Sequence, residues 1–187
     1  MGSDAPVKHV VFGVTGSIAA YKAAEIVRCL KKKGYRVSVI MTRKAQEFIA
    51  PLTFEILSEE RVWCSLFEGQ AQERIVRHIS LAQDADVLVI APASANIIGK
   101  IANGIADDLL STVAMATRAP VMLAPAMNEA MYENPVVQRN CANLKELGLI
   151  FVGPQKGALA CGTVGTGHIA PAEEIVSQVE TVLKSPS

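Results

Sequence analysis

The stretch over residues 85–110 most constrains what this chain can fold into. It opens with the apolar run Asp86-Val-Leu-Val-Ile-Ala91, which has the length of a strand. A strand that is apolar on both sides must be covered on both faces, as in a parallel sheet with helices on each side. Pro92 then ends the ladder because it has no N–H to donate. Apolar doublets recur every four residues from Ile97 to Leu110, which predicts one helix with an apolar stripe.

This strand and helix predict a ligand-binding site between them, because open α/β sheets bind ligands where a parallel strand ends and a helix begins. Ser94 and Asn96 lie at the turn and can either cap the helix or hydrogen-bond to a ligand. Gly99 and Gly104 would each cost the helix about 1 kcal/mol relative to alanine. A cofactor, a neighbouring helix or another subunit approaching closely would compensate, and tight packing on the chain's own sheet would explain the glycines equally well.

Composition narrows the class of protein. The chain has 187 residues, enough for one α/β domain with a full core. Half of its residues are hydrophobic and 19% are charged, which favours burial of subunit surfaces as well. The formal net charge is zero and no run approaches transmembrane length, so we expect neither a nucleic-acid partner nor a membrane partner.

The four cysteines are widely spaced and form no CxxC pair; they are Cys29, Cys64, Cys141 and Cys161. This spacing argues against a metal site and against a disulfide framework, and it fits a reducing cytoplasm. We expect residues 1–7 to form a flexible tail and residues 8–187 to form one domain.

Strand and helix patterns alternate along the chain. A strand over 9–13, a helix over 18–30 and a strand over 36–41 predict a βαβ unit with a right-handed crossover. We further expect strands at 119–124 and 149–152, a short edge strand at 61–67, helices at 45–57, 136–147 and from 171 onward, and loops at 69–77 and 153–169. The whole predicts a single doubly wound, Rossmann-like (flavodoxin-like) α/β domain with a mainly parallel sheet.

The first turn, Gly13-Val-Thr-Gly16-Ser17, is a candidate phosphate loop, although it is neither a P-loop nor GxGxxG. Its glycines allow backbone amides to converge at a helix N-terminus, where an anion is favoured. Many first turns in α/β proteins look similar. The second strand ends in Thr42-Arg43-Lys44, without the acid that grips a ribose, which favours a mononucleotide phosphate or a flavin over NAD.

Three residues on predicted loops at one edge of the sheet could carry chemistry. His78 could act as a base, or it could be structural. Asn128, in the segment after the strand at 119–124, could donate to a carboxylate or a flavin, or it could cap the next segment. Cys161 lies in a glycine-rich loop that could close over a substrate and deliver a proton, or it could be an ordinary free cysteine.

Three signatures occur in order: Pro92-Ala-Ser-Ala-Asn96 with its downstream Gly-Lys-Ile-Ala-Asn-Gly, then Pro125-Ala-Met-Asn-Glu-Ala-Met131, then the Cys161 loop. Together they resemble the homo-oligomeric flavin-containing cysteine decarboxylases, over nearly the whole chain. The resemblance implies FMN as the cofactor and a trimer, or a dodecamer of trimers, with flavin at subunit boundaries. It implies cofactor contacts from Gly16, Ser17, Ile18, Thr42, Ser94, Ala95, Asn96, Ile97 and Ala126.

The resemblance also implies His78 as an active-site residue, Asn128 as the ligand of the substrate carboxylate and Cys161 as a proton donor. Ala158, Leu159 and Ala160 would contact the substrate from the same clamp. The implied reaction oxidises the thiol of a substrate ending in cysteine, releases CO₂ and then reduces the enethiol. The resemblance implies phosphopantothenoylcysteine, in coenzyme A biosynthesis, as the substrate, and the alternative is the C-terminal cysteine of a ribosomally made peptide.

Three residues depart from the family pattern. Tyr132 replaces a tryptophan, Thr163 an acid and His168 an arginine, and the last two could alter how the clamp holds a phosphorylated arm. Two further functions are compatible with the same fold. One is a flavin-binding regulatory subunit, which would not need the three chemical residues, and the other is a flavin prenyltransferase, which would not need Cys161.

Overall fold

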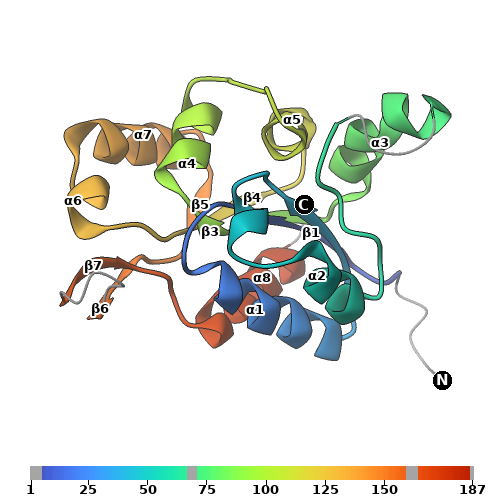
Figure 1. Cartoon of the computed structure of the whole chain (residues 1–187), viewed down its shortest axis with the longest axis horizontal. Coiled ribbons are helices and arrows are strands. Elements are labelled where there is room, and N and C mark those ends of the chain that lie inside the picture. The colour runs from blue at the N-terminus through green and yellow to red at the C-terminus, as the bar shows by residue number, and fades with distance from the viewer. Residues whose placement is uncertain (1–5, 67–70, 159–163, 186–187) are drawn as a thin grey trace.

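Five parallel strands form the centre of the computed structural model, which describes residues 6–66, 71–158 and 164–185. They are β1 (His9–Val14), β2 (Arg36–Met41), β3 (Val87–Ala93), β4 (Val121–Pro125) and β5 (Ile150–Phe151). Their spatial order is β2-β1-β3-β4-β5 and every pair is parallel (Figure 1). This is the flavodoxin-like order, so the predicted fold class is confirmed.

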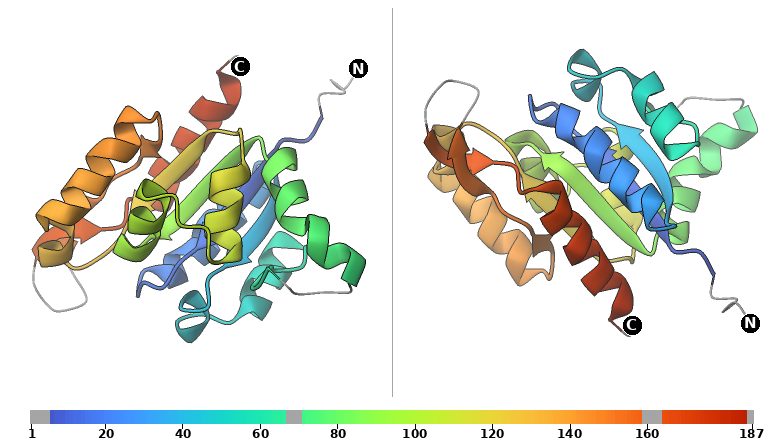
Figure 2. Two further views of the ribbon diagram at one scale, coloured as in Figure 1. Left: turned by 90° about the horizontal axis from the view of Figure 1, so that it is seen from above. Right: turned by 90° about the horizontal axis from the view of Figure 1, so that it is seen from below.

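Helices cover both faces of the sheet (Figures 1 and 2). One face is covered by α1 (Ala20–Lys32), α2 (Pro51–Ser58) and α8 (Ala172–Lys184). The other is covered by α3 (Ala71–Asp84), α4 (Ala95–Ala102), α5 (Leu109–Ala116) and α7 (Pro135–Glu146). Each face has its own apolar cluster, because alternate residues of the buried strands point to opposite sides. Across the described ranges, no helix combines the length and apolarity needed to span a bilayer.

The segment after β3 differs from the predicted single helix. The structure has two helices there, α4 and α5, and Gly104 between them adopts a left-handed φ of 67°. The Asp108 carboxylate then caps α5 by accepting from Ser111 N at 2.8 Å. The apolar doublets continue across this break, but a left-handed glycine and a capping aspartate are stop and start signals. Pro92 also does not end β3, which resumes pairing at Ala93 after a register shift.

Three other predicted segments need correction. Residues 71–77 of the predicted loop belong to α3, and the predicted helix over 45–57 is a 3₁₀ turn, Ala45–Glu47, followed by α2, which starts at Pro51. The predicted edge strand at 61–67 is, where described, only a bridge between Trp63 and Ile40. The predicted loop at 153–169 contains an antiparallel hairpin of β6 (Gln155–Ala158) and β7 (Val164–His168).

The glycines of β1 and α4 generate a first prediction. A Cβ at Gly13 would lie 2.5 Å from Leu110 Cδ1 and 3.3 Å from Ile90 Cγ1, whereas a Cβ at Gly99 would meet only Asn140 Nδ2 at 3.7 Å. We expect Gly13→Ala to lower the free energy of unfolding by about 1–3 kcal/mol through overpacking. Gly99→Ala should raise it by up to about 1 kcal/mol through helix propensity.

Urea denaturation of the two variants measures both effects. A neutral Gly13→Ala would contradict the packing described at β1. A destabilising Gly99→Ala would show that something outside this chain packs against α4.

Candidate functional site

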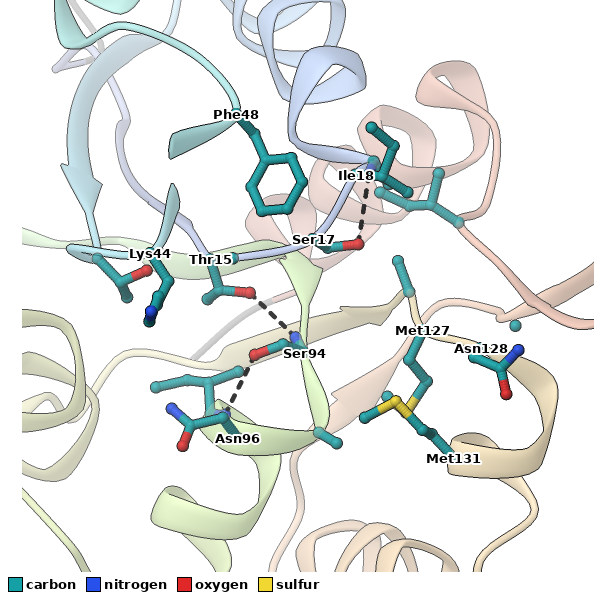
Figure 3. A pocket seen from close by; sticks show the side chains of 18 of the residues that line it. Thr15, Ser17, Ile18, Lys44, Phe48, Ser94, Asn96, Met127, Asn128 and Met131 are labelled. Atoms are coloured by element: carbon teal, nitrogen blue, oxygen red, sulfur yellow. Dashed lines mark hydrogen bonds between the residues drawn. The ribbon is translucent and has the colours of Figure 1, made fainter. Parts of the chain in front are cut away.

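A cavity of about 1080 Å³ opens at the carboxyl ends of the parallel strands. Its wall is built from the segments that follow β1, β2, β3 and β4, together with the end of β7 (Figure 3). This is the edge at which open α/β sheets bind ligands, and β1 and β3 meet there beside the point where the strand order reverses.

The hydroxyl of Thr15 joins the two central segments of this wall. It donates to the carbonyl of Pro92 at 2.7 Å and accepts from the backbone N–H of Ser94 at 3.0 Å. Thr15 is only 1% exposed, so these bonds are shielded from water. The end of β1 is thereby fixed against the end of β3, and the two walls keep one relative position.

The loop after β1 presents backbone donors to the cavity. Its Gly16 lies so close to Lys44 that an added Cβ would be 2.5 Å from the Lys44 Cβ. Within the described part of the chain, the backbone N–H groups of Gly16 and Ile18 donate no hydrogen bond. No side chain caps α1, which starts after Ala19. Unpaired N–H groups at an uncapped helix N-terminus form a site suited to an anion.

The turn after β3 contains Ser94 and Asn96. The Ser94 hydroxyl accepts from Ile97 N at 3.4 Å, so the predicted capping role of Ser94 is confirmed. Asn96 is exposed and its side chain projects into the cavity (Figure 3). A cap therefore fixes the start of α4, and an amide is left facing a ligand.

Asn128 lies at the far side of the cavity, after β4. Its Oδ1 accepts from Ala130 N at 3.0 Å and so caps the short helix α6 (Glu129–Tyr132), which confirms its predicted capping role. The carbonyl oxygen of the amide is thus used by the fold, and the donor groups are on Nδ2. Met127 and Met131 form an apolar wall beside it (Figure 3).

The β6–β7 hairpin is fixed against this same segment. The Glu129 carboxylate accepts from Thr166 N at 2.9 Å, and the Gly167 carbonyl accepts from Met127 N at 3.1 Å. A side chain at Gly165 would collide with the Glu129 carboxylate, and one at Gly167 with the Met127 carbonyl. Gly167 is therefore required by close approach to backbone, whereas a side chain at Gly165 would displace the Glu129 carboxylate from Thr166 N. The hairpin carries His168 to the cavity wall.

The cavity is lined by more basic than acidic side chains. Lys100 bonds Asp107 at 2.6 Å and Asp108 at 2.7 Å. Burial disfavours the charged form of Lys100, but these bonds outweigh it and raise the pKa of its ammonium. Burial likewise opposes the charge on Asp108, yet the hydrogen bonds from Lys100 and Ser111 hold the pKa of its carboxyl below the usual value.

Three further cations line the cavity: Lys22, Arg43 and Lys44. Among the residues that the structure describes, none of the three is paired with a carboxylate. Both acidic residues of the lining are occupied by Lys100, so the cavity has an excess of positive charge. Such a cavity suits an anionic ligand.

The structure brings most of the predicted site residues together. All nine predicted cofactor residues and Asn128 line the one cavity. Their binding roles stay predictions. Ala158 lies in β6, and Leu159, Ala160 and Cys161 lie outside the described residues.

His78 does not line the cavity, and the prediction that it lies on a loop was wrong. It belongs to α3, which packs against α5 away from α4 (Figure 2). Lys22 and Phe48 also line the cavity, and nothing in the sequence pattern predicted them. His168, which departs from the family pattern in the clamp, lines it too. The sequence did show Arg43 and Lys44 directly after β2, in place of the acid that would bind a ribose, and these basic residues indicated an anionic ligand.

Comparison with known proteins gives a family match and close relatives. A family model described as Flavoprotein matches residues 2–184. The chain is 46% identical over 168 residues to the coenzyme A biosynthesis bifunctional protein CoaBC of Haemophilus influenzae, covering 90% of this chain and 42% of that protein. It is 43% identical over 178 residues to the probable phosphopantothenoylcysteine decarboxylase of Streptococcus mutans, covering 94% of this chain and 99% of that one. The chain thus spans well under half of the bifunctional relative.

Solved structures agree in fold. A PPC decarboxylase mutant complexed with pantothenoylaminoethenethiol superposes with a TM-score of 0.85 at 33% identity, covering 96% of this chain and 100% of that chain. The FMN-dependent cysteine decarboxylase SpaF superposes with a TM-score of 0.80 at 32% identity, covering 95% of each.

The Thr15 bonds generate a second prediction. Thr15→Val keeps the shape of the side chain but leaves the Pro92 carbonyl and the Ser94 N–H without their partner. We expect the free energy of unfolding to fall by about 1–3 kcal/mol, the cost of burying unsatisfied polar groups. Thr15→Ser keeps the hydroxyl, so its free energy of unfolding should fall by less. In urea denaturation, a Thr15→Val variant as stable as the wild type, with the loss falling on Thr15→Ser instead, would show that the methyl group, and not the hydroxyl, holds the two segments.

Proposed function

Because the chain belongs to the Flavoprotein family, we propose that it uses FMN to decarboxylate 4′-phosphopantothenoylcysteine to 4′-phosphopantetheine, a step of coenzyme A biosynthesis. The observation that carries this proposal is that one cavity holds both the anion-binding loop after β1 and Asn128. The similarity to the Streptococcus mutans protein over 99% of its length supports the same activity here.

The size and lining of the cavity support binding of FMN together with a substrate. Its volume of about 1080 Å³ lies just above the roughly 300–1000 Å³ that ligand sites usually occupy. The unpaired N–H groups of Gly16 and Ile18 would hold the flavin phosphate, with the hydroxyls of Ser17 and Thr42 beside them. The turn over residues 94–97 would hold the flavin ring.

FMN, when bound, supplies the chemistry by accepting the two electrons of thiol oxidation and returning them in the final reduction. The chain's own residues would bind and orient the substrate around that chemistry. Asn128 Nδ2 would donate to the substrate carboxylate, placing it for loss as CO₂ once the oxidised sulfur carbon can accept its electrons. Cys161, which lies outside the described residues, would deliver a proton to the enethiol carbon.

A substrate that ends in a peptidyl cysteine is the second candidate. It is supported by the similarity to SpaF, whose name specifies an FMN-dependent cysteine decarboxylase. Asn128 would bind the terminal carboxylate in the same way for either substrate. The two candidates differ only in the far end of the molecule, which is a phosphorylated pantothenoyl arm in one and a peptide in the other.

A homo-oligomer explains the position of His78. Its helix α3 is not part of the cavity wall, so an active-site role requires that His78 reach the cavity of another subunit. Exposed apolar side chains beside the cavity support such contact, since Ile18 is 58% exposed, Tyr21 61% and Phe48 48%. A trimer, alone or as a unit of a dodecamer, would place flavin at its subunit boundaries.

A cytoplasmic location is part of the same proposal. The three cysteines that the structure describes, Cys29, Cys64 and Cys141, are free thiols. Free thiols fit a reducing compartment such as the cytoplasm.

Turnover by the wild type and by Asn128→Asp tests the proposed function. We expect the FMN-loaded wild type to convert phosphopantothenoylcysteine to CO₂ and phosphopantetheine. Asn128→Asp should lose at least about 100-fold in kcat/KM, because it places a carboxylate against the substrate carboxylate and removes a donor. Aspartate caps helices as well as asparagine does, so stability and FMN binding should be kept.

Mass spectrometry of the products measures the turnover of the wild type and of Asn128→Asp, with a cysteine-ended peptide as the competing substrate. Turnover of the peptide alone would move the assignment to the peptidyl branch. A fully active Asn128→Asp would contradict the role of the amide.

Mixing two inactive variants tests the shared site. His78→Asn and Asn128→Asp should each be inactive alone. If His78 and Asn128 of one site come from different subunits, mixed oligomers contain some intact sites, and activity should return when the variants are dissociated and reassembled together. No recovery in oligomers shown to be mixed by native mass spectrometry would place both residues in the same chain's site.

A further inference from the structure

A hydrogen bond between distant parts of the chain lies at the cavity wall. Lys22, in the first turn of α1, donates from Nζ to Nε2 of His168 at 3.3 Å. His168 ends β7, so the bond joins the hairpin to α1. Both side chains are half-buried and both line the cavity. Nothing in the proposed roles of the cofactor residues or of Asn128 uses this pair.

The surroundings of His168 fix which of its nitrogens accepts. Nδ1 lies 2.9 Å from the carbonyl oxygen of Ile169, which can only accept, so Nδ1 carries the proton. Nε2 is therefore the acceptor for Lys22. An ammonium has three donors, and no other hydrogen bond joins Lys22 Nζ to the described residues. Two donors of a cation that His168 holds in place are thus available to an anion in the cavity.

The strand order separates this pair from the basic segment after β2. Arg43 and Lys44 follow β2 at one edge of the sheet, whereas the hairpin is bonded to Met127 after β4, on the other side of β1 and β3. The pair is therefore on the side of Asn128, where the substrate carboxylate is proposed to lie. The cavity thus has two cationic regions, and a single flavin phosphate needs only one of them.

We propose that Lys22, held in position by His168, binds the phosphate monoester of the substrate. This inference rests on the proposed function and assigns the far end of its substrate. Lys22 is the phosphate ligand and His168 is the positioning residue. A peptide ending in cysteine has no group for this cation, so the pair would favour the phosphorylated small molecule. The flavin phosphate is the other possible source of the same chemistry, and the experiment separates the two.

The test compares phosphopantothenoylcysteine with its unphosphorylated form, pantothenoylcysteine, on the FMN-loaded protein. Lys22→Met should lower kcat/KM for the phosphorylated substrate by about tenfold or more, the size of a charge-assisted hydrogen bond. The loss should be in KM, with kcat kept at saturation, and the unphosphorylated substrate should be unaffected. Arg28→Met removes an exposed cation of α1 that does not line the cavity, and it should change neither substrate.

Variants of His168 test its positioning role. Glutamine can place an acceptor where Nε2 lies, whereas leucine cannot. We expect His168→Leu to show part of the KM increase of Lys22→Met for the phosphorylated substrate. His168→Gln should have a KM close to that of the wild type. A similar increase for the glutamine and leucine variants would overturn the positioning role.

Binding of FMN and of riboflavin identifies the source of the phosphate. The proposal expects Lys22→Met to leave both affinities unchanged. A weakened affinity for FMN alone would overturn the substrate assignment and make the flavin phosphate the bound group. Equal losses of kcat/KM for both cysteine substrates would overturn phosphate binding altogether. A wild type that binds FMN but turns over neither substrate would refute the proposed function. A loss of kcat/KM in Lys22→Met that is confined to the phosphorylated substrate supports both the proposed function and the phosphate assignment.

Discussion

The two hydrogen bonds of the Thr15 hydroxyl are the interaction on which the site depends. They join the carbonyl of Pro92 and the N–H of Ser94 to the end of β1, at the middle of the sheet. Each strand on its own would only end in a loop. Fixed together, the ends of β1 and β3 become two walls at a constant separation, with the N–H groups after Thr15 on one side and the start of α4 on the other. A rigid arrangement of this kind suits a flat, anionic cofactor, because little ordering remains to be done on binding.

Physical regularities explain what could be predicted from the sequence. Strands buried on both faces must be apolar throughout, so β1 and β3 were recognisable, and parallel strands bring the residues that follow them to one edge. For that reason Ser17, Thr42 and Ser94 could be placed together although they are far apart in the chain. Three ordered signatures predicted the family, and the family match over residues 2–184 confirms it.

Long-range contacts could not be predicted in this way. The glycines between 153 and 169 indicated a flexible loop, but Gly167 is required because the backbone at Met127 approaches the hairpin too closely for a side chain. The bond from Lys22 to His168 spans 146 positions and depends on that hairpin. His78 was predicted on a loop at the edge of the sheet that binds ligands, although it lies in α3, away from the cavity wall. Periodicity reports which face of an element is buried, and it does not report which distant element covers it.

A crystal structure of the protein with FMN tests the central claim most directly. The account predicts the phosphate within hydrogen-bonding distance of the backbone N–H groups of Gly16 and Ile18, and the ring against residues 94–97, with the Thr15 bonds intact. A flavin bound elsewhere on the chain, or a phosphate turned away from the loop after β1, would contradict it.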